Sequence, residues 1–350
     1  MIYYVVTRPF RGTINIFLAG GGKPLARHVR VLSYEELFRR RRVPVGTWIF
    51  SDLERLARED LERAAMCWEA LASSGHPVRL FNHPLRVKRR FELLRALHDC
   101  GVNEFDVHRL DEGRAPRRFP VFLRVENDHT GPETGLLRTP EEFESAVRRL
   151  ASEGKSRDQR VAVEYCAEAD EEGRYRKYAA FILDGQIVPR HLLVNKHWVV
   201  KGRDREACNE TIPEQIEYTE TNPHEAELRK IFEIAQIDYG RIDYTVVAGR
   251  IQVYEINTNP QITTPGWSGR VSQRSQIKLE FARKFLSIMT PLAIEGSKAS
   301  VPVDFDPGPA LQQRGLRVAD ALYWLTHKLG LGRLEPRVYT RMKKTFRRLK

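Results

Sequence analysis

The sequence has few cysteines and no long apolar run. Its four cysteines lie far apart, and no two of them form a CxxC pair: Cys67, Cys100, Cys166 and Cys208. This spacing argues against a zinc site or a disulfide framework and favours a reducing cytoplasm. No run approaches the roughly 18 apolar residues that a membrane-spanning helix needs, so no such helix is expected.

Two further signals are missing near the N-terminus. The stretch MIYYVVTRPFRG has no basic segment ahead of its apolar residues, so we expect a first strand there and not a signal peptide. The stretch LAGGGKPLARH lacks the GxxxxGKS or GxxxxGKT spacing of a phosphate loop, because Pro24 follows Lys23. We therefore assign it no nucleotide-binding role.

Positive charge is scarce outside the C-terminal end. The formal net charge is +12, but residues 311–350 contain eleven Lys and Arg against Asp320 and Glu335. Residues 1–310 are therefore close to neutral. Because a nucleic-acid enzyme is usually basic around its active cleft, this distribution argues against one.

Residues 311–350 are predicted to form a basic amphipathic helical tail. Val338, Met342 and Phe346 recur at i, i+4 and i+8, one stripe of a helix, with arginines and lysines on the other faces. Such a tail could pack on the body, lie on an anionic membrane surface, or bind an acidic partner or nucleic acid. If the tail lies on a membrane, a substrate of the protein would be lipid-linked or a cell-envelope precursor.

The rest of the chain is predicted to contain two α/β parts. Over residues 1–80, the apolar runs IYYVV, INIFLA and GTWIF are typical of strands, and LERLAREDLERAAMCWEALASSG is typical of a helix. Over residues 81–295, helices alternate with two antiparallel hairpins that turn at Asp184-Gly185 and Ala248-Gly249, which indicates an α+β region. Residues 296–310, rich in Pro, Gly and Ser, are expected to be a linker.

The second hairpin carries the strongest chemical signal. Glu255 and Asn257 are two residues apart, so their side chains lie on one face of a strand. Pairing around Ala248-Gly249 places Asp243 opposite or nearly opposite Glu255. Carboxylates this close repel each other unless a cation lies between them, and carboxylate and amide oxygens suit Mg²⁺. The alternative is an exposed strand end with a polar cap.

The closing stretch GRIDYTVVAGRIQVYEINTNP, with weaker features over roughly residues 80–262, resembles the ATP-grasp superfamily of carboxylate–amine ligases. The resemblance implies two α+β lobes that clamp ATP, preceded by a small Rossmann-like α/β unit. It also implies that Asp243, Glu255 and Asn257 hold two Mg²⁺ ions. Gln261 departs from the family pattern, in which Gly often follows this Pro, and this departure could alter the loop towards the acceptor.

The same resemblance implies nucleotide-binding residues. Lys88, in NHPLRVKRR, matches a lysine that reaches the phosphates, and Arg124 replaces a second phosphate lysine with a bidentate cation. The segment ENDHTGPETG takes the place of a glycine-rich loop over the phosphates. The strand VAVEYC is similar to the one that recognises adenine and ribose, through Glu164, Tyr165 and Cys166.

Arg176 matches an arginine near the reacting phosphoryl group in the family, and Arg190 is a second candidate for that catalytic zone. For each of them the alternative is a solvated surface charge. The polar cluster NKHWVVKGR could face the acceptor through Lys196, His197 or Lys201.

The resemblance implies a cytoplasmic, Mg²⁺-dependent ligase that forms an acyl phosphate from ATP and a carboxylate, joins it to an amine and releases ADP. Two alternatives remain open. One is an ATP-grasp kinase that phosphorylates a small-molecule hydroxyl. The other is a non-catalytic nucleotide-binding protein with a membrane- or nucleic-acid-binding tail.

Overall fold

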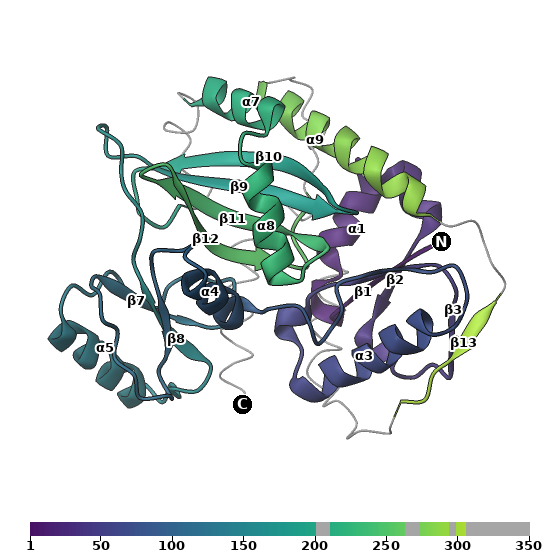
Figure 1. Cartoon of the computed structure of the whole chain (residues 1–350), viewed down its shortest axis with the longest axis horizontal. Helices are drawn as coiled ribbons and strands as arrows, with labels where there is room; N and C mark the ends of the chain where they lie inside the picture. The colour runs from purple at the N-terminus through teal and green to yellow at the C-terminus, as the bar shows by residue number, and fades with distance from the viewer. Residues whose placement is uncertain (201–210, 263–272, 294–298, 306–350) are drawn as a thin grey trace, which may run out of the picture. The chain divides into compact units, whose positions relative to one another are not determined.

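The computed structural model describes residues 1–200, 211–262, 273–293 and 299–305 (Figure 1). By its contacts the chain divides into two units, Met1–Asp304 and Phe305–Lys350. The predicted tail, residues 311–350, lies outside the described residues. Among the residues that are described, every helix is too short or too polar to cross a bilayer.

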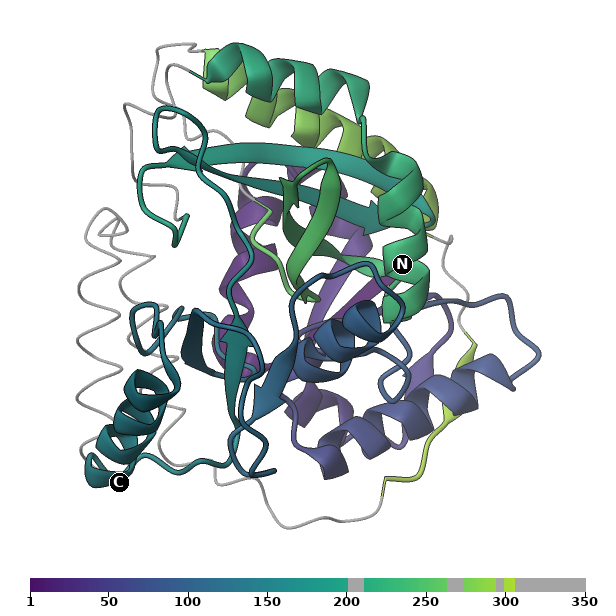
Figure 2. The same ribbon diagram turned by 60° about the vertical axis from the view of Figure 1, so that its left-hand side comes forward.

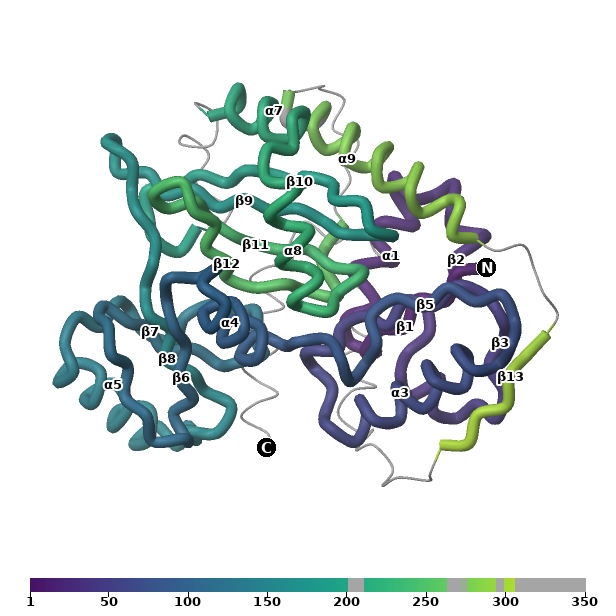
Figure 3. Tube along the Cα trace, viewed as in Figure 1, coloured from purple at the N-terminus to yellow at the C-terminus, as the bar shows by residue number. Residues whose placement is uncertain are grey.

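A parallel sheet forms the N-terminal part of the first unit, and Figure 3 follows its trace. The strand order is β2-β1-β4-β5, and every neighbouring pair is parallel. These elements are β1 (Ile2–Val6), β2 (Val29–Ser33), β4 (Thr47–Phe50) and β5 (Arg79–Phe81), with the helices α1 (Gly12–Ala19), α2 (Tyr34–Leu37) and α3 (Arg58–Ala72) and the short 3-10 turns η1 (Arg8–Phe10), η2 (Lys23–His28) and η3 (Leu53–Arg55). All five residues of β1 are buried, as expected for a central parallel strand.

The expected strand at INIFLA is wrong, because this stretch belongs to α1. Ile14 and Phe17, three residues apart, are its buried side chains, which is the spacing of a helix face. A short apolar run does not distinguish a strand from a buried helix by its pattern alone. The strand that pairs with β1 is instead β2, from the later stretch VRVLS.

An antiparallel sheet in the order β10-β9-β11-β12 forms the middle of the first unit. Its strands are β9 (Tyr175–Leu183), β10 (Gln186–Asn195), β11 (Tyr239–Val247) and β12 (Arg250–Asn257). Both predicted hairpins are confirmed, and all four turn residues have positive φ, as tight hairpin turns require. The helices α7 (Ile212–Thr221) and α9 (Gln273–Met289) run side by side along the sheet in Figures 1 and 2, and α8 (Glu225–Ala235) covers a face of it.

A smaller antiparallel sheet, β6-β8-β7, carries the strands β6 (Val107–Arg109), β7 (Val121–Val125) and β8 (Arg160–Glu164). The helix α5 (Pro140–Ser152) packs on it, and the Thr139 side chain caps α5 by accepting a hydrogen bond from the Glu142 amide, as its sequence predicts. The helix α4 (Arg90–Asp99) packs against both antiparallel sheets. In the described residues, one parallel sheet occurs together with antiparallel sheets, which confirms the mixed α/β and α+β class.

The expected linker, residues 296–310, contains a strand. β13 (Ser300–Pro302) pairs antiparallel with β3 (Arg42–Pro44), and Val301 is buried there. Residues 1–304 form one compact unit by their contacts. The boundaries predicted for residues 1–80 and 81–295 therefore stay predictions.

Asn82 joins the parallel sheet to β11. Its Nδ2 donates to the carbonyl oxygens of Phe50, at 3.1 Å, and Tyr239, at 2.7 Å, while its Oδ1 accepts from the amides of Asp238 and Tyr239. The residue is fully buried and has a φ of 62°. Because β11 carries Asp243, this amide fixes the proposed metal strand to the N-terminal sheet.

We predict that Asn82→Ala lowers the free energy of unfolding by roughly 2 to 4 kcal/mol, because buried backbone groups lose their partners. Urea denaturation of both proteins measures the change. Asn222→Ala is the matched control, since Asn222 also has a positive φ but is only partly buried. It should cost less than about 1 kcal/mol. Equal losses in the two variants would contradict the role given to Asn82.

Candidate functional site

The β11–β12 hairpin brings the predicted carboxylates together. Asp243 and Glu255 are direct partners in the ladder, and so are Arg241 and Asn257. Directly opposed residues of an antiparallel pair point to the same face, so these four side chains share one face of the sheet. The predicted placement of Asp243 opposite Glu255 is confirmed.

A bulge beside this pair changes the direction of one side chain. The register shifts after Asp243, because Tyr244 pairs with Val253 and leaves Tyr254 without a partner in the ladder. Tyr254 and Glu255 therefore both line the same cavity although they are neighbours in sequence. Strict alternation assigns them to opposite faces, which is why the sequence does not indicate Tyr254.

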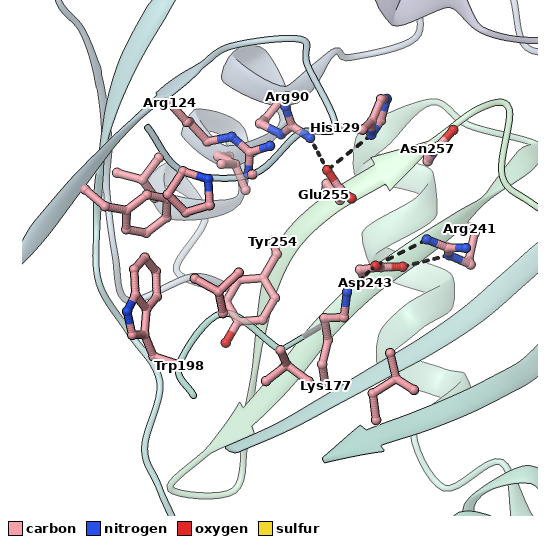
Figure 4. A pocket seen from close by; sticks show the side chains of 18 of the residues that line it. Arg90, Arg124, His129, Lys177, Trp198, Arg241, Asp243, Tyr254, Glu255 and Asn257 are labelled. Atoms are coloured by element: carbon pink, nitrogen blue, oxygen red, sulfur yellow. Dashed lines mark hydrogen bonds and ion pairs between the residues drawn. The ribbon is translucent and has the colours of Figure 1, made fainter. Parts of the chain in front are cut away.

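The cavity has a volume of about 540 Å³ and an apolar end (Figure 4). The ring of Trp198 lies there, with its centroid 5.2 Å from that of Phe122 and 5.7 Å from that of Tyr165. Other apolar side chains also line the cavity: Leu94, Phe105, Val163, Leu193, Val199, Val200 and Tyr254. A flat apolar ring fits such surroundings.

The other end of the cavity is strongly charged. The cavity lining contains five Lys and Arg side chains and one His: Arg55, Arg90, Arg124, His129, Lys177 and Arg241. Three carboxylates also line the cavity: Glu164, Asp243 and Glu255. Positive charge is therefore in excess, so the charged end favours an anionic ligand.

Asp243 is paired with two of these cations. Arg241 Nε lies 2.7 Å from its Oδ1, and Lys177 Nζ lies 2.9 Å from its Oδ2. The side chain is almost fully buried. Burial opposes ionisation, but Arg241 and Lys177 outweigh it and hold the pKa of Asp243 below its usual range.

Glu255 is paired with two others. Arg90 donates a hydrogen bond to Oε2, and His129 Nδ1 lies 3.7 Å from the same atom. These cations outweigh burial and hold the pKa of Glu255 well below its usual range. Burial lowers the pKa of His129, but Glu255 and Glu54 raise it to about 9, so the imidazole is charged at neutral pH.

Of the two predicted phosphate cations, one lines the cavity. Arg124 does so, and its Nη2 donates to the Asp128 carbonyl at 2.8 Å. Burial lowers the pKa of Arg124 to about 10, which still leaves it charged at neutral pH. Lys88 is not part of the lining, and Arg90, two residues further on, lines the cavity instead.

The predicted adenine strand also reaches the cavity. Glu164, Tyr165 and Cys166 line it. The Glu164 carboxylate accepts hydrogen bonds from the backbone amides of Asp106, at 3.1 Å, and Arg118, at 3.2 Å. This carboxylate therefore also fastens the local backbone.

The predicted catalytic arginines do not line the cavity. Arg176 pairs with Asp170 and with Glu214 of α7, away from Lys177, because successive side chains of β9 alternate. Arg190 lies in a bulge of β10, with its guanidinium 4.6 Å from the centroid of the Phe281 ring. Their catalytic roles therefore stay predictions, whereas Lys177 and Arg241 line the cavity.

Alternation along β9 and the two-residue spacing before Asp243 are the signals that could have indicated Lys177 and Arg241. In the cluster NKHWVVKGR, Trp198 lines the cavity, whereas Lys196 and His197 are exposed and are not part of its lining. Lys201 and Arg203 lie outside the described residues. A prediction of aromatic packing around Trp198 needs Phe122 and Tyr165, which only the fold brings near.

The predicted metal ligands supply suitable donors. Asp243 and Glu255 are ionised, and Asn257 adds an amide oxygen on the same face, although that oxygen accepts from the Asn259 amide at 2.7 Å. Hard oxygen donors of this kind fit Mg²⁺. Side-chain cations already neutralise the two carboxylates, so their closeness does not by itself require a metal. In the described part of the chain, His, Cys, Asp and Glu form no cluster of three or more that could hold one.

We predict that Arg90→Ala weakens the binding of inorganic tripolyphosphate about tenfold to hundredfold, the effect of one charged hydrogen bond. Isothermal titration measures the affinity. Lys88→Ala is the control, because Lys88 belongs to the same segment but does not line the cavity. Its affinity should match that of the unmodified protein. A larger loss in Lys88→Ala than in Arg90→Ala would contradict this assignment.

No family model matches the chain, and no curated protein matches it. Solved structures to which it is similar include a D-alanine–D-alanine ligase from Bacillus anthracis complexed with ATP (12% identity, 82% of this chain and 99% of that chain, TM-score 0.44). Others are a RimK domain ATP-grasp protein from Sphaerobacter thermophilus (14%, 81% and 100%, 0.44) and the VanG D-Ala:D-Ser ligase from Enterococcus faecalis (11%, 84% and 99%, 0.47).

Proposed function

We propose that the chain is an ATP-dependent, ADP-forming ligase that activates a carboxylate as an acyl phosphate and joins it to an amine. The observation that carries the proposal is the two-ended cavity, which is aromatic at one end and cationic at the other. A nucleoside triphosphate has the same division between an apolar base and a polyanionic chain.

The aromatic end would hold the adenine. Trp198 and Tyr254 offer aromatic rings for the base, and the Glu164 carboxylate also lines the cavity. Apolar walls with a few polar groups are the usual construction of a cofactor pocket.

The cationic end would hold the phosphates. Arg90 and Arg124 lie near one another, since both donate to the Asp128 carbonyl. Two guanidinium groups so close are suited to bidentate contacts with phosphate oxygens. Phosphoryl transfer depends chiefly on positioning and on stabilising charge, which fixed cations in a partly dry cavity supply.

Asp243, Glu255 and Asn257 would hold Mg²⁺, which supplies further neutralisation of the phosphates when it is bound. Lys177 and Arg241 both form ion pairs with Asp243. They would therefore lie where negative charge develops during phosphoryl transfer. They would stabilise the acyl phosphate and the tetrahedral state that follows attack by the amine. Arg124, Glu164, Tyr165 and Cys166 keep their proposed roles in nucleotide binding.

The preference for a ligase over a kinase comes from the resemblance of the closing hairpin in sequence. Both activities need the same phosphate-binding end, and they differ in the nucleophile that receives the phosphoryl group. The substrates are proposed to be a small-molecule or envelope-precursor carboxylate and an amine, and only chemistry at the acceptor distinguishes the two activities.

An ADP-release screen of carboxylates with amines tests the proposal. We predict ADP formation that requires both substrates, with a joined product lighter than the sum of the two by one water, read by mass spectrometry. Glu255→Gln should remove at least about 99% of this activity, because a neutral side chain cannot hold the metal as a carboxylate does. Binding of a non-hydrolysable ATP analogue should survive in Glu255→Gln.

Glu62→Gln is the control, since Glu62 lies exposed on α3 and pairs with Arg58, one turn away. Formation of a stable phosphorylated product without an amide would show that the protein acts as a kinase and not as a ligase. No ATP binding to the unmodified protein would end the proposal.

Arg241 and Arg176 give a second, independent test. We predict that Arg241→Met lowers ligase turnover by at least about a hundredfold, because a donor to the developing charge is lost. Arg241→Lys should recover part of that loss. Arg176→Met, on the opposite face of the sheet, should stay within about threefold of the unmodified enzyme. Steady-state kinetics decides, and a larger effect at Arg176 than at Arg241 would restore Arg176 as the catalytic arginine.

A further inference from the structure

A glutamate of the N-terminal part, Glu54, lies next to a residue that lines the charged end of the cavity. Glu54 lies in η3, is 8% exposed and is not itself part of the lining. Thr258, next to Asn257, donates its hydroxyl to Glu54 Oε2 at 2.6 Å. Glu54 is therefore tied to the end of β12, the strand that carries the proposed metal ligands.

The other carboxylate oxygen of Glu54 contacts a histidine that lines the cavity. Glu54 Oε1 lies 3.3 Å from His129 Nε2, and His129 Nδ1 lies 3.7 Å from Glu255 Oε2. His129 lines the cavity, and Figure 4 shows its ring turned towards Glu255. A carboxylate, an imidazole and a second carboxylate thus form one chain from the N-terminal part to the proposed metal ligand.

Glu54 is held rigidly enough to orient another group. Asp52, just before η3, has a φ of 60°, and its carboxylate accepts hydrogen bonds from Thr7 and Arg55. The Leu53 amide donates to the hydroxyl of Thr258 at 3.1 Å. The backbone on the N-terminal side of Glu54 is therefore held by contacts that do not involve His129.

His129 belongs to residues 126–135, which follow β7 and are the segment predicted to form the phosphate loop. The start of this segment is fixed by Arg109, whose Nε lies 2.9 Å from Glu126 Oε2, and by the contacts of Arg90 and Arg124 with the Asp128 carbonyl. At His129 the segment is held through a charged side chain between two carboxylates. Loss of one of them removes part of the electrostatic attraction that keeps the imidazole in the cavity.

We infer that Glu54 is a positioning residue, which contacts His129 and so holds this side chain and its loop at the phosphate end of the cavity, beside Glu255. This inference rests on the proposed function, because it assigns the charged end to phosphates. It makes the N-terminal part of the chain a component of the nucleotide site. A purely structural Glu54 would instead act through Thr258 and would not depend on His129.

A double-mutant cycle separates these two roles. Glu54→Gln keeps an oxygen that can accept from Thr258 but removes the charge that attracts His129. In the nucleotide-free protein, we predict that Glu54→Gln and His129→Gln each speed amide hydrogen exchange of residues 129–135 about tenfold, since the loop loses an ion pair. The double variant should exchange no faster than His129→Gln alone. Glu62→Gln, an exposed glutamate, should leave the loop unchanged.

Nucleotide binding gives the second arm of the same cycle. Glu54→Gln and His129→Gln should each weaken the binding of a non-hydrolysable ATP analogue about tenfold. The two effects should again not add in the double variant. Effects that add, or that leave loop exchange unchanged, would overturn the inference. If Glu54→Gln does not fold, Glu54→Asp takes its place, because it keeps the charge but shortens the reach to His129.

Failure of the inference and failure of the proposed function can be told apart. An unmodified protein that binds no nucleotide contradicts the proposed function, while the exchange of residues 129–135 still decides whether Glu54 acts through His129. Normal nucleotide binding with additive effects contradicts the inference alone.

Discussion

The pairing of buried charge on the β11–β12 hairpin is the constraint on which the site depends. Asp243 and Glu255 are opposed on one face and largely removed from water, where an uncompensated carboxylate is strongly unfavourable. Lys177 and Arg241 compensate one carboxylate, and Arg90 and a loop histidine compensate the other. The cations come from separate strands, a helix and a loop, so the demand for neutrality draws these elements to one place.

The second constraint is the joint between the parallel sheet and this hairpin. Asn82 satisfies backbone groups of both, and the Tyr4 hydroxyl donates to Asn259 Oδ1 at 3.0 Å, just beyond β12. Thr258 adds a contact to Glu54 at the same point. Because three polar contacts surround the end of β12, the N-terminal part sets where the carboxylates of that strand lie. The parallel sheet therefore serves the site although most of the cavity lining lies elsewhere.

Much of this arrangement follows from local sequence, and the remainder does not. Ala248-Gly249 determines the turn, and the turn sets the register from Val247↔Arg250 to Tyr244↔Val253. Continued without a bulge, this register brings Asp243 to within one residue of Glu255, and the bulge at Tyr254 makes them direct partners. The bulge at Tyr254 has no such local signal, so one wall of the cavity was missed. Whether Arg90 or Lys88 lines the cavity also depends on how α4 packs, because both residues are basic and only two positions apart.

The paired cations also explain how the hairpin can be stable and still suit a metal. A hard cation binds the ionised form of a carboxylate, and the neighbouring arginine, lysine and histidine keep Asp243 and Glu255 in that form at neutral pH. Burying these charges costs free energy when the chain folds, and the ion pairs of each carboxylate offset that cost in the folded protein. Fixed charges of this kind need little rearrangement when phosphate arrives, and that is the condition under which electrostatic stabilisation of phosphoryl transfer is strongest.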